Sequence, residues 1–225
     1  MKVIITGTTG MVGEGVLLEC LTNPKVTEVL SVSRKPAGIS HPKLKEYLVP
    51  DFLALKEPEE KLEGYDACFF CAGVSSVGMK EPEYTRMTYD TTLKFARAVS
   101  PNPGMTFVYV SGAGTDSTEK GRMMWARVKG KTENDLMKLP FKKVFGFRPG
   151  FMVPTKGQKR VLKYYNYVSW LIPLIKVFFP NSITTISQVG QAMIYAAQNS
   201  YGKNIVEVRD MKILSSMLPG NSKKN

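Results

Sequence analysis

The stretch that decides the fold is residues 1–15, MKVIITGTTGMVGEG. The β-branched run Val3-Ile4-Ile5 predicts a short buried strand over residues 2–6. Three glycines follow in the spacing G-x-x-G-x-x-G, and residues 11–21 show the apolar recurrence of a packed helix. A strand that passes through a tight glycine turn into a helix presents free backbone N–H groups and the positive end of the helix dipole to a phosphate. The sequence therefore predicts a dinucleotide-binding turn.

Each glycine of this motif has its own expected task. Gly7 allows the tight turn, Gly10 lets a pyrophosphate approach the backbone, and Gly13 lets the helix pack closely on the strand. Four neighbouring residues are expected to add hydroxyl or backbone donors to the phosphate site: Thr8, Thr9, Met11 and Val12. The alternative is a glycine-rich turn that binds no ligand.

The residues that follow the second expected strand, at 26–32, indicate which dinucleotide is bound, NAD or NADP. It is followed by Ser33-Arg34-Lys35, at about the distance from the glycines where an acidic residue would bind the ribose 2′-hydroxyl of NAD. No acid stands there, and Arg34 and Lys35 can instead clamp a 2′-phosphate. This pattern favours NADP over NAD as the cofactor. The alternative is a pair of solvated basic residues at a strand end.

Strands and helices alternate along the rest of the chain. Further strands are expected at residues 44–49, 66–71, 105–110 and 143–147, with helical segments at 81–100 and 121–139. A last helix is expected at 187–198 and a short final strand at 204–208. This alternation predicts an α/β, Rossmann-type fold with a doubly wound parallel sheet in the order 3-2-1-4-5-6 plus the short final strand.

Residues that follow these strands complete the predicted cofactor site, because ligands of this fold lie across the carboxyl ends of the strands. Asp51 is expected to accept from the adenine amino group. Phe52 beside it is expected in the core or at the cofactor. The remaining expected contacts follow the fourth and sixth strands: Cys71, Ala72, Gly73, Pro149 and Gly150.

Length and composition indicate one domain. The 225 residues, 43% hydrophobic and 22% charged, suit a single Rossmann domain at 1–217, with a substrate-side helical part at 156–200 and a disordered tail at 218–225. We expect no signal peptide, because a core strand begins at residue 2. The 3 cysteines are expected to be reduced thiols of a cytoplasmic protein.

The pair Cys68 and Cys71 has the spacing of a metal or redox site. It lies in the expected strand YDACFFCAG, where residues three apart point to opposite faces. Since the chain contains only 1 histidine, His41, and no second cysteine pair, we expect no metal site.

The net charge of +12 is concentrated in the C-terminal third of the chain. Residues 136–206 contain no Asp or Glu and ten basic residues. A positive surface suits an anionic ligand, a membrane or a nucleic acid; no motif for nucleic-acid binding accompanies it. Within it, the basic and aromatic stretch 156–180 is too short and too interrupted for a membrane span. Several roles remain open for that stretch, among them weak contact with an anionic membrane, a homodimer surface, and a lid or core helices beside a small-molecule substrate.

Six motifs together resemble the short-chain dehydrogenase/reductase superfamily, in particular its small, atypical, epimerase-like members. They are TGTTGMVG at 6–13, SRK at 33–35, CAG at 71–73, YVSGAG at 109–114, WARVKGKTE at 125–133 and RPG at 148–150. The resemblance covers nearly the whole chain. It implies an NADP(H)-binding oxidoreductase that acts on a small organic carbonyl or quinone-like acceptor.

The same resemblance identifies candidate catalytic residues. In this superfamily a Tyr-x-x-x-Lys pair lies on the helix after the fifth strand, and here the pair is Trp125 and Lys129. Lys129 is expected to hold the nicotinamide ribose and Ser111 to polarise the acceptor. An indole N–H cannot act as an acid or base near neutral pH, so another group must supply the proton. The possible sources are water, Ser111 or another tyrosine, and the tyrosines available are Tyr84, Tyr89, Tyr164, Tyr165 and Tyr167. The alternative is a non-catalytic, NADP(H)-sensing regulatory or scaffold protein with 156–180 as its partner surface.

Overall fold

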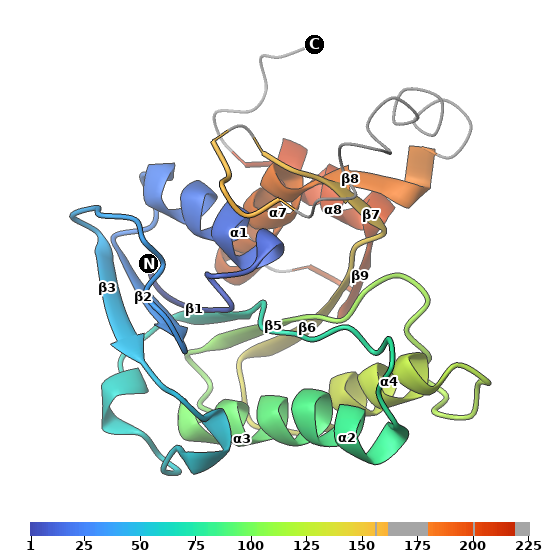
Figure 1. The fold of residues 1–225 in the computed structure, drawn as a ribbon. Coiled ribbons are helices and arrows are strands. Elements are labelled where there is room, and N and C mark those ends of the chain that lie inside the picture. Colours follow the sequence, from blue (N-terminus) through green and yellow to red (C-terminus); the bar gives the residue numbers. More distant parts are fainter. Residues whose placement is uncertain (156, 162–179, 200, 219–225) are drawn as a thin grey trace.

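The computed structural model describes residues 1–155, 157–161, 180–199 and 201–218. Most of the stretch 156–180 and nearly all of the predicted tail therefore lie outside the described residues. In the part that is described, seven parallel strands form one sheet in the order β3-β2-β1-β4-β5-β6-β9 (Figure 1). The strands are β1 (Lys2–Thr6), β2 (Glu28–Ser33), β3 (Leu44–Leu48), β4 (Ala67–Phe70), β5 (Thr106–Val110), β6 (Lys143–Arg148) and β9 (Ile205–Glu207). The predicted strand order and the short final strand are confirmed.

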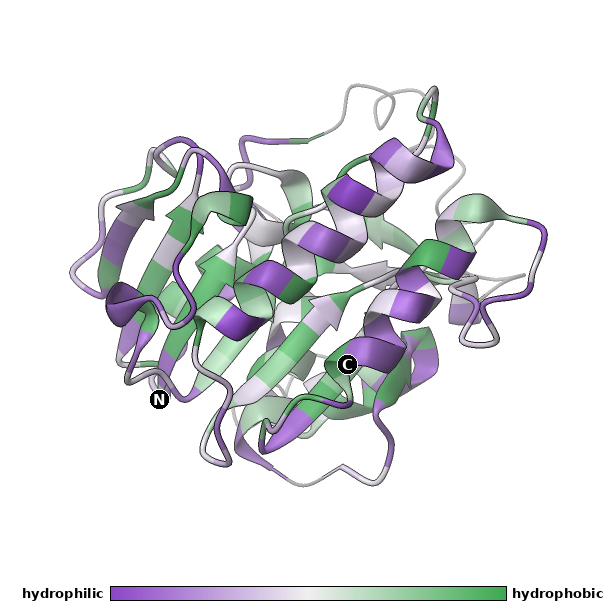
Figure 2. Ribbon diagram, turned by 90° about the horizontal axis from the view of Figure 1, so that it is seen from below, coloured by the Kyte–Doolittle hydropathy of each residue, from purple (hydrophilic) through white to green (hydrophobic). Residues whose placement is uncertain are grey.

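Helices cover both faces of this sheet. On one face lie α1 (Met11–Thr22), α7 (Ile186–Gln198) and α8 (Val208–Ser216), with α7 packed against the other two (Figure 1). On the other face lie α2 (Glu81–Thr85), α3 (Thr91–Ala98) and α4 (Met124–Leu136). Seen from the side of α2, α3 and α4, these helices carry many hydrophilic turns over a predominantly hydrophobic sheet (Figure 2). None of the described helices combines the length and hydrophobicity that a membrane crossing needs.

Two hydrophobic cores result from the period of two along each strand. Val3 and Ile5 of β1 lie in the core beneath α1 and α7, whereas Ile4 between them lies in the core above α3. Cys68 belongs to the core of Ile4, and Cys71 packs against the core of Val3. The predicted divergence of these two cysteines is therefore confirmed, and burial raises the pKa of both thiols, that of Cys71 to about 12.

The structure contains three features that the sequence did not predict. The expected helix 81–100 is divided by a π-helical turn, Arg86–Asp90, between α2 and α3. A small parallel pair of strands joins β7 (Phe151–Val153) to β8 (Ile183–Thr185). Helix α8 follows β9 directly and begins with a capping box formed by Glu207 and Asp210.

Candidate functional site

The glycine turn joins β1 to α1 and has little room for side chains. Gly7 adopts a φ of 70°, and a Cβ there would lie 2.7 Å from the backbone nitrogen of Ala72 at the end of β4. A Cβ on Gly13 would lie 2.2 Å from the carbonyl oxygen of Gly7, whereas a Cβ on Gly10 would come no closer than 3.4 Å to that oxygen. Gly7 and Gly13 are thus required by the fold itself, while Gly10 leaves the turn open. No side chain caps the first turn of α1, so its N–H groups suit an anionic ligand.

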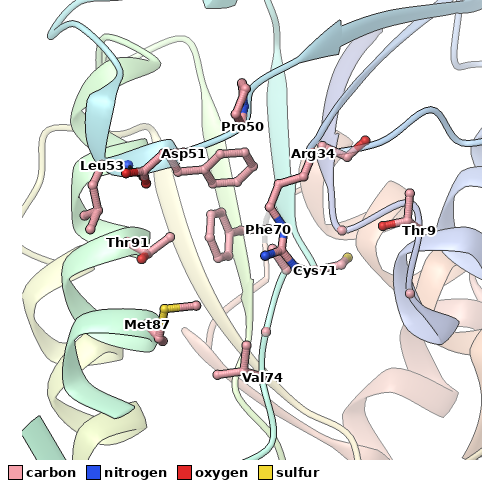
Figure 3. A pocket seen from close by; sticks show the side chains of 16 residues that line it. Thr9, Arg34, Pro50, Asp51, Leu53, Phe70, Cys71, Val74, Met87 and Thr91 are labelled. Carbon is pink, nitrogen blue, oxygen red and sulfur yellow. Dashed lines mark hydrogen bonds between the residues drawn. The ribbon is translucent and has the colours of Figure 1, made fainter. Parts of the chain in front are cut away.

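A cavity of about 330 Å³ opens beside this turn, across the carboxyl ends of β1, β2 and β4. Ten of the predicted cofactor residues line it: Gly7, Thr9, Gly10, Ser33, Arg34, Asp51, Phe52, Cys71, Ala72 and Gly73. Figure 3 shows the Arg34 side chain extending into the cavity from the end of β2. Lys35 next to it is exposed and is not among the lining residues. The residues that sequence reasoning gathered from four separate loops therefore surround one cavity.

Asp51 has a local structural role as well as a place in the cavity wall. Its Oδ1 atom accepts a hydrogen bond of 2.9 Å from the backbone N–H of Leu53 and thereby caps the 3₁₀ turn Phe52–Ala54. Phe52 is buried in the core and also lines the cavity, so both of its expected positions apply.

Some predicted residues lie elsewhere. The Thr8 side chain is fully buried and its hydroxyl hydrogen-bonds the Ser31 hydroxyl at 2.7 Å, so the expected hydroxyl donor to phosphate is not presented to the cavity. Gly150 makes room for the chain before β8, because a Cβ there would lie 2.3 Å from the carbonyl oxygen of Ser182. The predicted residues that do not line the cavity are Thr8, Met11, Val12, Gly13, Lys35, Lys129, Pro149 and Gly150.

Six lining residues were missed by sequence reasoning: Pro50, Leu53, Phe70, Val74, Met87 and Thr91. Met87 lies in the π-helical turn and Thr91 begins α3, so the two residues are four positions apart on the helical stretch that follows β4. Figure 3 shows both side chains on the same side of the cavity. That spacing, together with the position after β4, was the signal available in the sequence.

Ser111 and Lys129 meet at the end of β5. The Lys129 ammonium donates to the carbonyl oxygen of Ser111. The Ser111 side chain is buried, and its hydroxyl donates to Glu133 Oε1 at 2.5 Å and to the carbonyl oxygen of Phe147 at 3.1 Å. This corrects the expectation that the Ser111 hydroxyl is available to an acceptor: it is engaged by Glu133, one helical turn beyond Lys129.

Burial lowers the pKa of Lys129 from the ordinary 10.5 to about 8, and the nearby Glu133 carboxylate opposes this change. Between these two values the folded chain binds fewer protons than the unfolded chain, so stability rises with pH in that window. The difference corresponds to about 3 kcal/mol at about 1.4 kcal/mol per pKa unit.

The Lys129→Met variant has no titrating group at this position, so its stability lacks this dependence on pH. We expect the free energy of unfolding of the wild type, minus that of the variant, to rise by about 2–3 kcal/mol between pH 7 and pH 10.5. Urea denaturation at a series of pH values measures this difference. A difference that stays constant with pH would contradict the shifted lysine pKa.

Trp125 lies one helical turn before Lys129 on α4, beside the loop that follows β5. A Cβ on Gly114 of that loop would lie 3.3 Å from Trp125 Cη2. Tyr84 is buried, and Tyr89 donates its hydroxyl to Asp135 at 2.7 Å. The other three candidate tyrosines, Tyr164, Tyr165 and Tyr167, lie outside the described residues.

The chain is similar in sequence to a group of fungal proteins. It is 28% identical over 166 residues to "Protein fmp52, mitochondrial" of Emericella nidulans, covering 71% of this chain and 70% of that protein. It is 25% identical over 217 residues to "Protein FMP52-1, mitochondrial" of Scheffersomyces stipitis, covering 90% and 91%. A rat protein, HTATIP2 of Rattus norvegicus, is 25% identical over 161 residues, covering 71% and 66%. No family model matches the chain.

The names of these fungal relatives correct one expectation. Relatives from four species are called mitochondrial, which overturns the cytoplasmic location expected from the sequence. Composition and reduced cysteines do not distinguish these two compartments.

Solved structures share the fold at low sequence identity. A UDP-N-acetylglucosamine 4-epimerase from Methanobrevibacter ruminantium superimposes with a TM-score of 0.66 and 14% identity, covering 91% of this chain and 75% of the epimerase. The protein MoeE5, solved with UDP-glucose and NAD, superimposes with a TM-score of 0.64 and 17% identity, covering 98% and 82%. The chain therefore shares the Rossmann-type α/β fold of these two proteins.

Proposed function

We propose that the protein binds NADP(H) in the cavity beside the glycine turn and acts as an oxidoreductase on a small carbonyl or quinone-like compound. The observation that carries this proposal is the cavity itself. It combines an open glycine turn and an uncapped helix N-terminus with Arg34 at the end of β2, where no acidic residue stands. The similarity in fold to MoeE5, solved with NAD, supports a pyridine nucleotide as the ligand.

Three sets of residues would hold three parts of this cofactor: the pyrophosphate, the 2′-phosphate and the nicotinamide ribose. The first turn of α1 and Gly10 would hold the pyrophosphate, because their backbone is not crowded by side chains. Arg34 would pair with the 2′-phosphate through its planar guanidinium. Lys129, which lies outside the residues that line the cavity and donates to the Ser111 carbonyl oxygen, would hold the nicotinamide ribose. When bound, NADP(H) supplies or accepts the hydride.

Arg34→Ala is expected to weaken NADPH binding by about 30- to 100-fold, because a charge-assisted contact with phosphate contributes about 2–3 kcal/mol. NADH binding should change by less than about threefold, since NADH carries no 2′-phosphate. Calorimetric titration measures both affinities. The control is Arg97→Ala, which removes the same charge from an exposed position on α3 that does not line the cavity. Equal weakening of NADPH and NADH by Arg34→Ala would contradict the 2′-phosphate assignment.

A non-catalytic, NADP(H)-sensing protein is the second candidate function. Two observations favour it: Trp125 occupies the position one turn before Lys129, and the Ser111 hydroxyl is engaged by Glu133. Neither side chain offers a proton to an acceptor. Turnover of NADPH by Trp125→Tyr but not by the wild type, in a screen of carbonyl and quinone acceptors, would favour the sensor. Turnover by the wild type would favour the oxidoreductase.

A further inference from the structure

The chain that follows β7 returns to the glycine turn and is fastened to the start of α1 (Figure 1). The Gln158 side chain donates to the carbonyl oxygen of Met11 at 2.7 Å and accepts from the backbone N–H of Thr155 at 2.6 Å. The contact joins residues 147 positions apart in the sequence. The segment 157–160 thus packs against the start of α1, beside the phosphate-binding turn and outside the residues that line the cavity.

Glu14 fixes the backbone of this segment. Its side chain is in the first turn of α1, and the residue is only 2% exposed. Its two carboxylate oxygens accept from the backbone N–H groups of Lys159, at 3.1 Å, and Arg160, at 2.8 Å. Buried carboxylates are retained where hydrogen bonds satisfy them, and these two bonds hold residue 160 in place.

Gly15 supplies the space for the contact. A Cβ there would lie 2.3 Å from Ile186 Cγ2 and 3.1 Å from the Gln158 side-chain amide. A fourth glycine, outside the phosphate motif, therefore lets both α7 and the Gln158 side chain lie close to α1.

The Arg160 side chain reaches from this anchor toward the glycine turn. Its Nη1 atom donates to the carbonyl oxygen of Thr8 at 2.9 Å. Its Nη2 atom lies 3.8 Å from the position that a Cβ would take on Gly38, four residues after Arg34. The guanidinium therefore lies between the glycine turn and the loop after β2. No carboxylate in the described part of the chain forms an ion pair with it.

This is the region where the adenosine ribose of a dinucleotide lies in a Rossmann fold. The glycine motif at 7–13 contains no basic residue. Among the described residues that line the cavity, Arg34, directly after β2, is the only basic one. A phosphate monoester carries a charge of about −1.5 to −2 at neutral pH, more than one guanidinium neutralises. A second cation held between Thr8 and Gly38 would balance that charge.

We propose that Arg160 is a second specificity-determining residue for NADP(H), gripping the 2′-phosphate together with Arg34, and that Glu14 is its positioning residue. This inference rests on the proposed function and deepens it. It assigns cofactor selection to a segment about 120 residues beyond the end of β2.

The test compares Arg160→Gln with Lys159→Gln, a neighbouring variant with the same change of charge. The Lys159 side chain is exposed, and only its backbone contacts Glu14. The probes are 2′,5′-ADP, which carries the 2′-phosphate without the pyrophosphate, and 5′-ADP, which carries the pyrophosphate alone. We expect Arg160→Gln to weaken 2′,5′-ADP and NADPH by about 10- to 30-fold and to change 5′-ADP and NADH by less than about twofold. Lys159→Gln should change all four by less than about threefold.

Two results would overturn the inference. Equal weakening of 2′,5′-ADP and 5′-ADP would assign Arg160 to the pyrophosphate, and unchanged binding of both would remove it from the site. In either case the loss of NADPH selectivity in Arg34→Ala would still support the proposed function. A wild type that binds none of the four compounds would instead refute the proposed function itself.

Glu14→Gln provides a second readout, because it replaces one of the two accepting carboxylate oxygens with an NH2 group that cannot accept from a backbone N–H. A positioning role predicts a fall in the ratio of NADPH to NADH affinity. A purely structural role predicts that both affinities fall together, and this outcome would contradict the assignment of Glu14.

Discussion

Glu133→Ala is expected to lower the free energy of unfolding by about 3–5 kcal/mol, because it removes one partner from a buried ion pair. The Glu133 side chain is 0% exposed and that of Arg148 only 11%. The carboxylate accepts from Arg148 Nη2 at 2.5 Å and Nε at 3.2 Å, and from the Ser111 hydroxyl. Without the Glu133 carboxylate, the Arg148 guanidinium and the Ser111 hydroxyl lose their main acceptor.

A matched control is the exposed pair of Arg127 and Glu81. These side chains also form a carboxylate–guanidinium contact, at 2.7 Å, but Glu81 is 50% exposed. Glu81→Ala is expected to lower stability by less than about 1 kcal/mol. Urea denaturation measures both variants. If Glu133→Ala and Glu81→Ala lower the free energy of unfolding by equally small amounts, the ion pair of Glu133 and Arg148 does not hold α4 on the sheet.

Gly13→Ala is expected to lower the free energy of unfolding by about 3 kcal/mol and to abolish dinucleotide binding. The added Cβ would lie 2.2 Å from the carbonyl oxygen of Gly7 and 2.9 Å from the backbone nitrogen of Thr8. Both neighbours are backbone atoms of the turn, so α1 must move away from β1. The phosphate-binding N–H groups of α1 would move with it.

Gly10→Ala is expected to weaken ligand binding while leaving the fold intact. Its Cβ would lie 3.4 Å from the nearest backbone atom, an ordinary contact, so stability should change by less than about 1 kcal/mol. The same methyl group faces the expected path of the pyrophosphate, and binding should weaken by about tenfold or more. Thermal unfolding and nucleotide titration of both variants give the comparison. A Gly13→Ala variant with wild-type stability and binding would contradict the close packing described here.

The order of the strands in the sheet is predictable from the sequence, because few topologies satisfy the alternation of strands and helices. Right-handed crossovers and ligands at the carboxyl ends of parallel strands are general properties of α/β folds. The position of Arg34 followed from its fixed distance from the glycines. These predictions concern backbone topology, which depends on the pattern of the chain more than on individual contacts.

Side-chain directions were harder to predict, because they depend on neighbours that are distant in sequence. Thr8 is next to Gly7, yet its hydroxyl bonds to Ser31 of β2. Ser111 matched the expected polarising serine, yet its hydroxyl bonds to Glu133 on α4. Neither contact has a local signal in the sequence.

The contribution of the segment after β7 was hidden for the same reason. In the sequence Arg160 is one of ten basic residues at 136–206, and its place beside Thr8 depends on Glu14 and Gly15 in α1. The segment follows the short strand β7, and three-residue strands such as β7 and β8 leave too little periodicity to be recognised.

The most direct test of the central claim is a calorimetric titration of the wild-type protein with NADPH and, separately, with NADH. We expect NADPH to bind with a Kd in the micromolar range or below, at least about tenfold more tightly than NADH. If neither nucleotide binds at millimolar concentration, the cavity beside the glycine turn is not a dinucleotide site, and the proposed function is wrong.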